Sequence, residues 1–178
     1  MKIIRQLTRS ILGAVCAAMT LTIPTALLTA DDHPGLNAVA IKANAGVTAV
    51  LTPTSDPAVA KVTITGVIQS SLGTWLESGE LEARFPPTPD QPVIVNGTAT
   101  WTSPDGANTL KLTLAGTAIP DPASPAFYNA NYQITFTGGT GAYASARGQA
   151  ELNEVVMFTS AATATTTWNL KGFVIKKP

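Results

Sequence analysis

The acidic side chains on strand-like segments are the first candidates for chemistry in this sequence. Five of them lie in segments where apolar and polar residues alternate: Glu77, Glu80, Glu82, Glu151 and Glu154. Two carboxyl groups facing each other across about 5 to 9 Å could work as the acid and the nucleophile or base of a glycosidase. Charged residues are seldom fully buried without a partner, so an exterior, solubilising role is the favoured interpretation for the group.

Glu77 differs from the other acids because it shares its parity with Trp75 and Leu81, which are expected to point inward from the same segment. A buried carboxyl group is either a functional group with a shifted pKa or the partner of a buried cation. Arg147 is the expected cation. Arg147 can point into the mouth of the barrel or outward; if both residues face inward, we predict that Glu77 and Arg147 lie within salt-bridge reach.

Other catalytic groups are scarce in this chain. The single histidine, His33, lies in a proline-flanked tail, which argues against a serine–histidine–aspartate triad. The single cysteine, Cys16, lies in the N-terminal apolar run, so a processed chain would hold no disulfide, thiol nucleophile or thiolate metal site. We expect no catalytic residue, no cofactor and no metal within the folded domain, and a role other than catalysis is favoured.

The first thirty residues have the layout of a secretory signal peptide. Three basic residues within the first nine positions are followed by the uncharged stretch 10–30 and then by two aspartates. A transmembrane anchor is the alternative because the run is about long enough to span a bilayer, but Pro24 and four threonines argue against it. We expect cleavage after Ala30, a secreted or periplasmic protein, and no membrane contact after cleavage.

Cleavage at that point would change the charge and the N-terminus. Eight basic residues would remain against eleven acidic ones, a net charge of −3, which argues against nucleic acid as a partner. Residues 31–37 would form a flexible tail. Its first three residues, Asp31-Asp32-His33, could bind copper(II) through the amine, two amides and the imidazole in a square plane.

Residues 38–178 are interpreted as one all-β domain. Consecutive strands joined by short turns favour an eight-stranded antiparallel up-and-down barrel, with an open β-sandwich as the alternative. Loops rich in proline are expected at 86–92 and 119–125, a turn is expected at 103–108, and no helix is expected. The expected strands are 38–51, 59–71, 74–85, 93–102, 109–118, 131–138, 146–158 and 166–175.

Three glycines, Gly138, Gly139 and Gly141, fall between two of these strands. They permit positive φ angles and a close approach of the backbone, as in a structural turn. A phosphate-binding loop is excluded because a strand follows rather than a helix and no lysine is present. Tyr143 is expected to fold its ring over the glycines, with Arg147 on the strand that follows.

The run from Gly138 to Ala150, Gly-Gly-Thr-Gly-x-aromatic-x-x-Ala-Arg-Gly-x-Ala, resembles the C-terminal motif of plant dirigent proteins and of the related allene oxide cyclases. Small secreted bacterial proteins carry similar motifs. The resemblance implies an eight-stranded antiparallel barrel and suggests a homo-oligomer, a trimer. Dirigent proteins orient phenoxy radicals for coupling, and the cyclases close an epoxide into a ring. No pocket residue outside the glycine motif matches, so neither activity is carried over.

The tryptophans on strands leave the role of the barrel interior open. Trp75, Trp101 and Trp168 either pack the core or form a stacking wall for a flat apolar ligand. The first interpretation of function is a small exported barrel that holds a small apolar or aromatic molecule. The alternatives are a structural or surface protein with a filled barrel, and a cofactor-free isomerase of the dirigent or cyclase kind. The candidate ligand-binding residues are Glu77, Tyr143, Arg147, Trp75 and Trp101.

Overall fold

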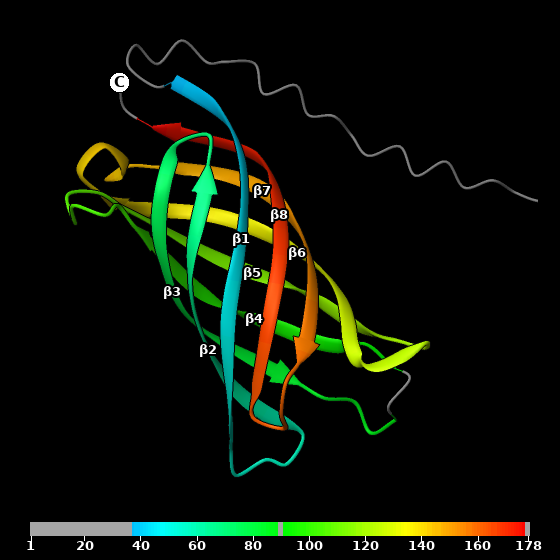
Figure 1. Ribbon diagram of the computed structural model, residues 1–178. Helices are drawn as coiled ribbons and strands as arrows, with labels where there is room; N and C mark the ends of the chain where they lie inside the picture. The colour runs from blue at the N-terminus through cyan, green and yellow to red at the C-terminus, as the bar shows by residue number, and fades with distance from the viewer. Residues whose placement is uncertain (1–36, 89–90, 177–178) are drawn as a thin grey trace, which may run out of the picture. The chain divides into compact units, whose positions relative to one another are not determined.

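The computed structural model describes residues 37–88 and 91–176 and shows one closed barrel of eight antiparallel strands (Figure 1). Each strand pairs with the next in the chain, and the last pairs with the first to close the barrel. The all-β, up-and-down barrel is thereby confirmed, and the open sandwich is wrong. The predicted signal peptide, residues 31–36 of the tail and the Asp31-Asp32-His33 motif lie outside the described residues. The strands are β1 (Asn37–Pro53), β2 (Val59–Ser70), β3 (Gly73–Arg84), β4 (Val93–Thr102), β5 (Thr109–Asp121), β6 (Ser124–Thr140), β7 (Arg147–Phe158) and β8 (Thr163–Lys176).

Alternation of apolar and polar residues gives each strand an inner and an outer face. In β5, Leu110, Leu112 and Leu114 are buried, whereas Lys111 and Thr113 between them are exposed. The inner faces of all eight strands join in a single hydrophobic core. An eight-stranded barrel has an interior just wide enough for side chains to fill, so the size of each inward residue decides whether space remains.

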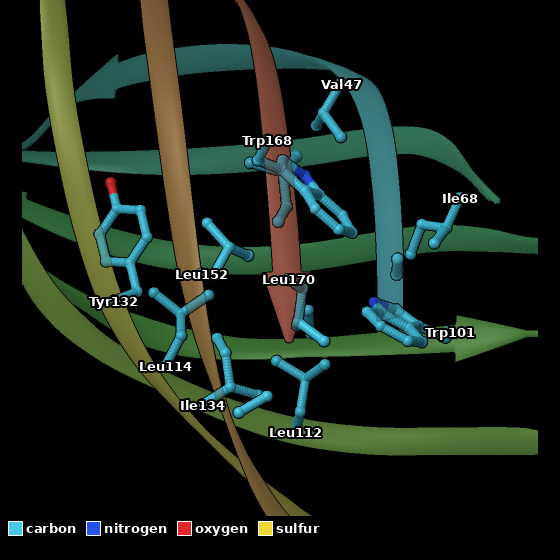
Figure 2. Packing of buried hydrophobic residues seen from close by; sticks show 14 of the residues in the cluster. Val47, Ile68, Trp101, Leu112, Leu114, Tyr132, Ile134, Leu152, Trp168 and Leu170 are labelled. Atoms are coloured by element: carbon cyan, nitrogen blue, oxygen red, sulfur yellow. The ribbon is translucent and has the colours of Figure 1, made fainter. Parts of the chain in front are cut away.

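Aromatic side chains fill one half of the interior. The rings of Trp101 and Trp168 stack with centroids 6.2 Å apart, and Phe136 meets Trp101 edge-on at 6.0 Å. Figure 2 shows Trp101 among the buried aliphatic residues, with Ile68 beside it. Stacked and edge-on pairs of this kind add to the free energy gained from burial alone.

The hairpin between β5 and β6 is longer than the sequence predicted. Residues 119–125 were expected to form a loop, but β5 continues to Asp121 and β6 begins at Ser124. Pro120 pairs with Tyr128, while the pairing of β4 with β5 ends at Ala118. Beyond Ala118 the edge of β5 that faces β4 pairs with no strand of the described residues, and edge strands are where proline is tolerated in a sheet.

A short 3₁₀ helix, η1 (Gly141–Tyr143), joins β6 to β7, where no helix was expected. It is a single turn, and its last residue, Tyr143, is buried. None of the helical residues in the described part of the chain forms a segment that is long and apolar enough to cross a membrane.

Candidate functional site

An apolar recess of about 80 Å³ lies inside one end of the barrel. All eight strands contribute to it, at the end where β1 is joined to β2 and β7 to β8. Its mouth is lined by half-buried apolar and aromatic residues, among them Leu51, Phe85, Tyr128 and Phe158. Tyr128 and Phe158 meet edge-on with their ring centroids 5.4 Å apart.

The recess exists because several inward positions at this end carry small residues. Ala49, Ala83, Ala118 and Ala164 come from four different strands, and all four are buried in its wall. Since an eight-stranded barrel needs larger side chains to close its interior, these alanines leave space that the tryptophans remove in the other half.

Three polar residues lie at the inner end of the recess, which we call the floor. Tyr132, Glu154 and Thr166 are the lining residues farthest from the mouth on β6, β7 and β8. Burial raises the pKa of Glu154, and the nearby hydroxyls of Thr166 and Tyr132 act in the opposite direction. Burial, followed by the charge of Glu154, raises the pKa of Tyr132.

Thr166 has unused hydrogen-bonding capacity. Its side chain is 5% exposed, and its Oγ1 atom makes no hydrogen bond with the described residues. It lies close enough to influence the pKa of Glu154, but the geometry between the two groups is not that of a hydrogen bond.

Glu77 is buried in the barrel as its parity predicted, but it does not line the recess. Its Oε1 accepts a hydrogen bond of 3.0 Å from the indole Nε1–H of Trp101, and its Oε2 has no partner among the described residues. Burial raises the pKa of Glu77 to about 7; the Trp101 hydrogen bond opposes this, and the charge of Glu154 adds to it. The charge of Glu154 thus reaches the carboxyl group of Glu77 within the barrel.

The predicted contact between Glu77 and Arg147 does not form. Arg147 is the first residue of β7 and is exposed, because it has the opposite parity from the inward Ala150 and Leu152. The ion pairs among residues 37–88 and 91–176 are instead on the surface and join Arg84 to Asp56 and Glu82. Trp101, not a cation, is the partner of Glu77.

The motif glycines are required by the neighbouring β4–β5 turn. A Cβ atom on Gly139 would collide with the carbonyl of Thr109, and one on Gly141 would collide with the side chain of Asn108. Gly138 adopts a φ of 136° beside a bulge in the β5–β6 pairing. The atoms nearest to a Cβ at these positions are therefore backbone and Asn108 atoms.

Tyr143 and Trp75 pack together at the end of the barrel opposite the recess. Their ring centroids are 5.3 Å apart in an edge-on arrangement, and the Nζ of Lys176 lies 5.0 Å from the Tyr143 ring. Both residues also line a surface hollow with Ser103 and Asn108. The predicted ligand-binding set is thus divided: Glu77, Trp75, Trp101 and Tyr143 are buried away from the recess, and Arg147 is exposed.

Glu154, Tyr132 and Thr166 were not among the candidate site residues. Glu154 had been grouped with the exterior acids, and it is instead half-buried and lines the recess, whereas Glu80, Glu82 and Glu151 are exposed. Parity could have distinguished it, because Glu154 follows the inward Leu152 by two residues.

The fold and the recess define a small closed β-barrel with an apolar internal site. No family model matches the chain, and no curated protein matches it. Among solved structures, the chain is similar to the pterocarpan synthase dirigent protein GePTS1, with 13% sequence identity and a TM-score of 0.39. The similarity covers 80% of this chain and 86% of that protein. A match at this level concerns the barrel at most and carries no inference about a ligand or a reaction.

Proposed function

We propose that the protein is exported and binds one end of a small apolar or aromatic molecule in the recess. The observation that supports ligand binding is the recess itself, an apolar space of about 80 Å³ in a barrel whose other half is packed with aromatic rings. Space of this kind, lined by apolar atoms, is unfavourable to water and accepts apolar ligands of matching size.

The volume limits what can enter. An engineered protein cavity of about 150 Å³ holds benzene, and this recess is about half that size. A ligand would therefore place a short aliphatic group or part of one ring inside. The rest of the molecule would lie at the mouth against Phe85, Tyr128 and Phe158, which are half-buried and apolar on their ring faces.

A structural or surface protein with a filled barrel is the second candidate. The stacking of Trp101 on Trp168 and the burial of Phe136 favour it, since packed aromatic rings occupy that half of the barrel. A cofactor-free isomerase is the third candidate, and the buried carboxyl groups of Glu77 and Glu154 are the side chains that could move a proton in it.

Ligand binding can be tested with toluene as the probe, followed by ligand-observed NMR. Wild-type protein should bind toluene, and Ala164→Val, which fills the recess, should abolish binding. Ala115→Val is the matched control because Ala115 is exposed on β5. Near-ultraviolet circular dichroism would establish that both variants are folded.

Native mass spectrometry of protein purified from its own host would complement the NMR experiment and report the oligomeric state as well. A bound small molecule would support the proposal. An empty protein that also fails to bind toluene would favour the filled structural barrel.

A further inference from the structure

The floor of the recess has a different chemistry from its walls. Nearer the mouth, β7 and β8 contribute the apolar side chains of Val156, Phe158 and Ala164, whereas the next inward positions carry Glu154 and Thr166. A ligand that is apolar throughout would satisfy the walls. It would leave the buried hydroxyl of Thr166 without a partner and the carboxyl group of Glu154 without a cation at its inner end.

The charges in the barrel indicate the sign of the charge that a ligand should carry at the floor of the recess. Glu77 and Glu154 both face the interior, and the lysines and arginines of residues 37–88 and 91–176 are exposed, except for Lys176. Lys176 is half-buried beside Tyr143, at the end opposite the recess. The carboxyl group at the floor therefore has no cation from the described chain to pair with.

We infer that the recess binds a small primary amine, whose ammonium group lies between Glu154 and the unpartnered hydroxyl of Thr166 while its apolar body lies against the alanine-lined wall. This inference rests on the proposed function and names the class of its ligand. An ammonium group offers three donors and a positive charge, and it satisfies both floor residues at once. An anionic ligand would face two carboxyl groups and is disfavoured.

Amine binding is coupled to protons. The groups facing Glu154 are Tyr132 from β6, Thr166 from β8 and, from the opposite wall, Glu77. Burial raises the pKa of Glu154, so the empty site holds a proton more readily than an exposed glutamate does. An ammonium ion favours the carboxylate form, and its binding should therefore release a proton and weaken as the pH falls.

Three probes of nearly equal shape test this inference: benzylamine, benzyl alcohol and toluene. In wild-type protein near neutral pH, benzylamine should bind at least about tenfold more tightly than toluene, a difference that one charge-assisted hydrogen bond can supply. The affinity for benzylamine should fall as the pH is lowered and the affinity for toluene should not, because only the carboxylate form of Glu154 pairs with the ammonium group.

Two substitutions test which side chains cause the preference for benzylamine over toluene. Glu154→Gln should remove the preference for benzylamine over toluene, and Glu151→Gln, an exposed neighbour on the same strand, should retain it. Thr166→Val keeps the shape of the side chain and should weaken benzylamine several-fold without weakening toluene. It serves as the second test if Glu154→Gln does not fold.

The outcomes separate the inference from the proposed function. Equal binding of benzylamine and toluene, or a benzylamine affinity that does not fall as the pH is lowered, would overturn the inference and leave the apolar recess intact as a binding site. Failure of all three probes to bind would overturn the proposed function instead.

Discussion

The two halves of the barrel interior are built from the same eight strands but from side chains of very different size. In one half, Trp101 and Trp168 stack on each other and Phe136 packs against them. In the other half, alanines line a recess of about 80 Å³. The backbone of a closed barrel sets how much interior there is, and the sizes of the inward side chains decide whether it becomes a core or a site.

The two ends also differ in how they are closed. At the aromatic end, the Oδ1 of Asn108 in the β4–β5 turn accepts a hydrogen bond of 2.9 Å from the backbone N–H of Ala142 in η1. Gly139 and Gly141 bring the two turns into this contact. At the recess end, half-buried rings such as Phe85 and Phe158 stand at the mouth. We therefore expect substitutions at the aromatic end to cost more stability than comparable substitutions at the mouth.

The largest effect should come from Trp101→Ala, which removes the stacked ring and the hydrogen-bond donor to Glu77. We expect it to lower the free energy of unfolding by about 5 kcal/mol, because a large cavity forms and a buried acceptor loses its partner. Phe158→Ala, at the half-buried mouth, should lower it by only about 1 kcal/mol. Urea denaturation measures both, and equal losses would mean that the two ends are packed alike.

Gly139→Val should cost roughly 4 kcal/mol, because the new side chain meets the carbonyl of Thr109 and forces the two turns apart. Gly46→Ala is the control, since a Cβ there reaches no atom closer than 4.0 Å. That substitution should change stability by less than about 0.5 kcal/mol. A thermal midpoint of Gly139→Val equal to that of the wild type would show that the backbone at Gly139 is not tightly packed against Thr109.

The pH dependence of stability should report the buried carboxyl group beneath Trp101. Glu77 is 7% exposed, and its pKa is raised from the usual 4.5 to about 7. The folded state then holds a proton that the unfolded state has lost, so stability is greatest below about pH 4.5 and falls as the pH rises to about 7. For this residue the fall amounts to about 3 kcal/mol.

Glu77→Gln should remove that part of the decline and make the protein more stable than the wild type above pH 7, since the amide oxygen can still accept the Trp101 hydrogen bond. Glu80→Gln, exposed on the same strand, should leave the profile unchanged. Parallel wild-type and Glu77→Gln profiles from urea denaturation at several pH values would show that Glu77 is ionised without penalty in the folded protein.

The alternation of residue types was enough to predict the strands and their inner faces. The pattern of Leu110, Leu112 and Leu114 identified β5, and the parity of Glu77 placed its carboxyl group inside. The expected contact of Arg147 with Glu77 followed from the need of a buried carboxyl group for a cation. The parity of Arg147, opposite to that of the inward Ala150, predicts an exposed side chain instead. The local alternation of residues was therefore a reliable guide, whereas the expected contact between side chains of distant strands was wrong.

The recess could not have been predicted from any single strand. It depends on Ala49, Ala83, Ala118 and Ala164 reaching the same level of the barrel, which follows from the register of all eight strand pairs. The β5–β6 hairpin was missed for a related reason. Proline is excluded from a strand only where a neighbouring strand needs the N–H that it lacks. The sequence does not show which edge of β5 has a neighbour at Pro120.

That hairpin also bears on edge-to-edge aggregation between copies of the protein. Past Ala118 the edge of β5 that faces β4 has no neighbouring strand among residues 37–88 and 91–176, and a bare strand edge is a template onto which another chain can add. Pro120 lies on that edge, and Pro122 lies in the turn at its tip. The prolines that obscured the hairpin in the sequence therefore make its exposed edge a poor site for aggregation.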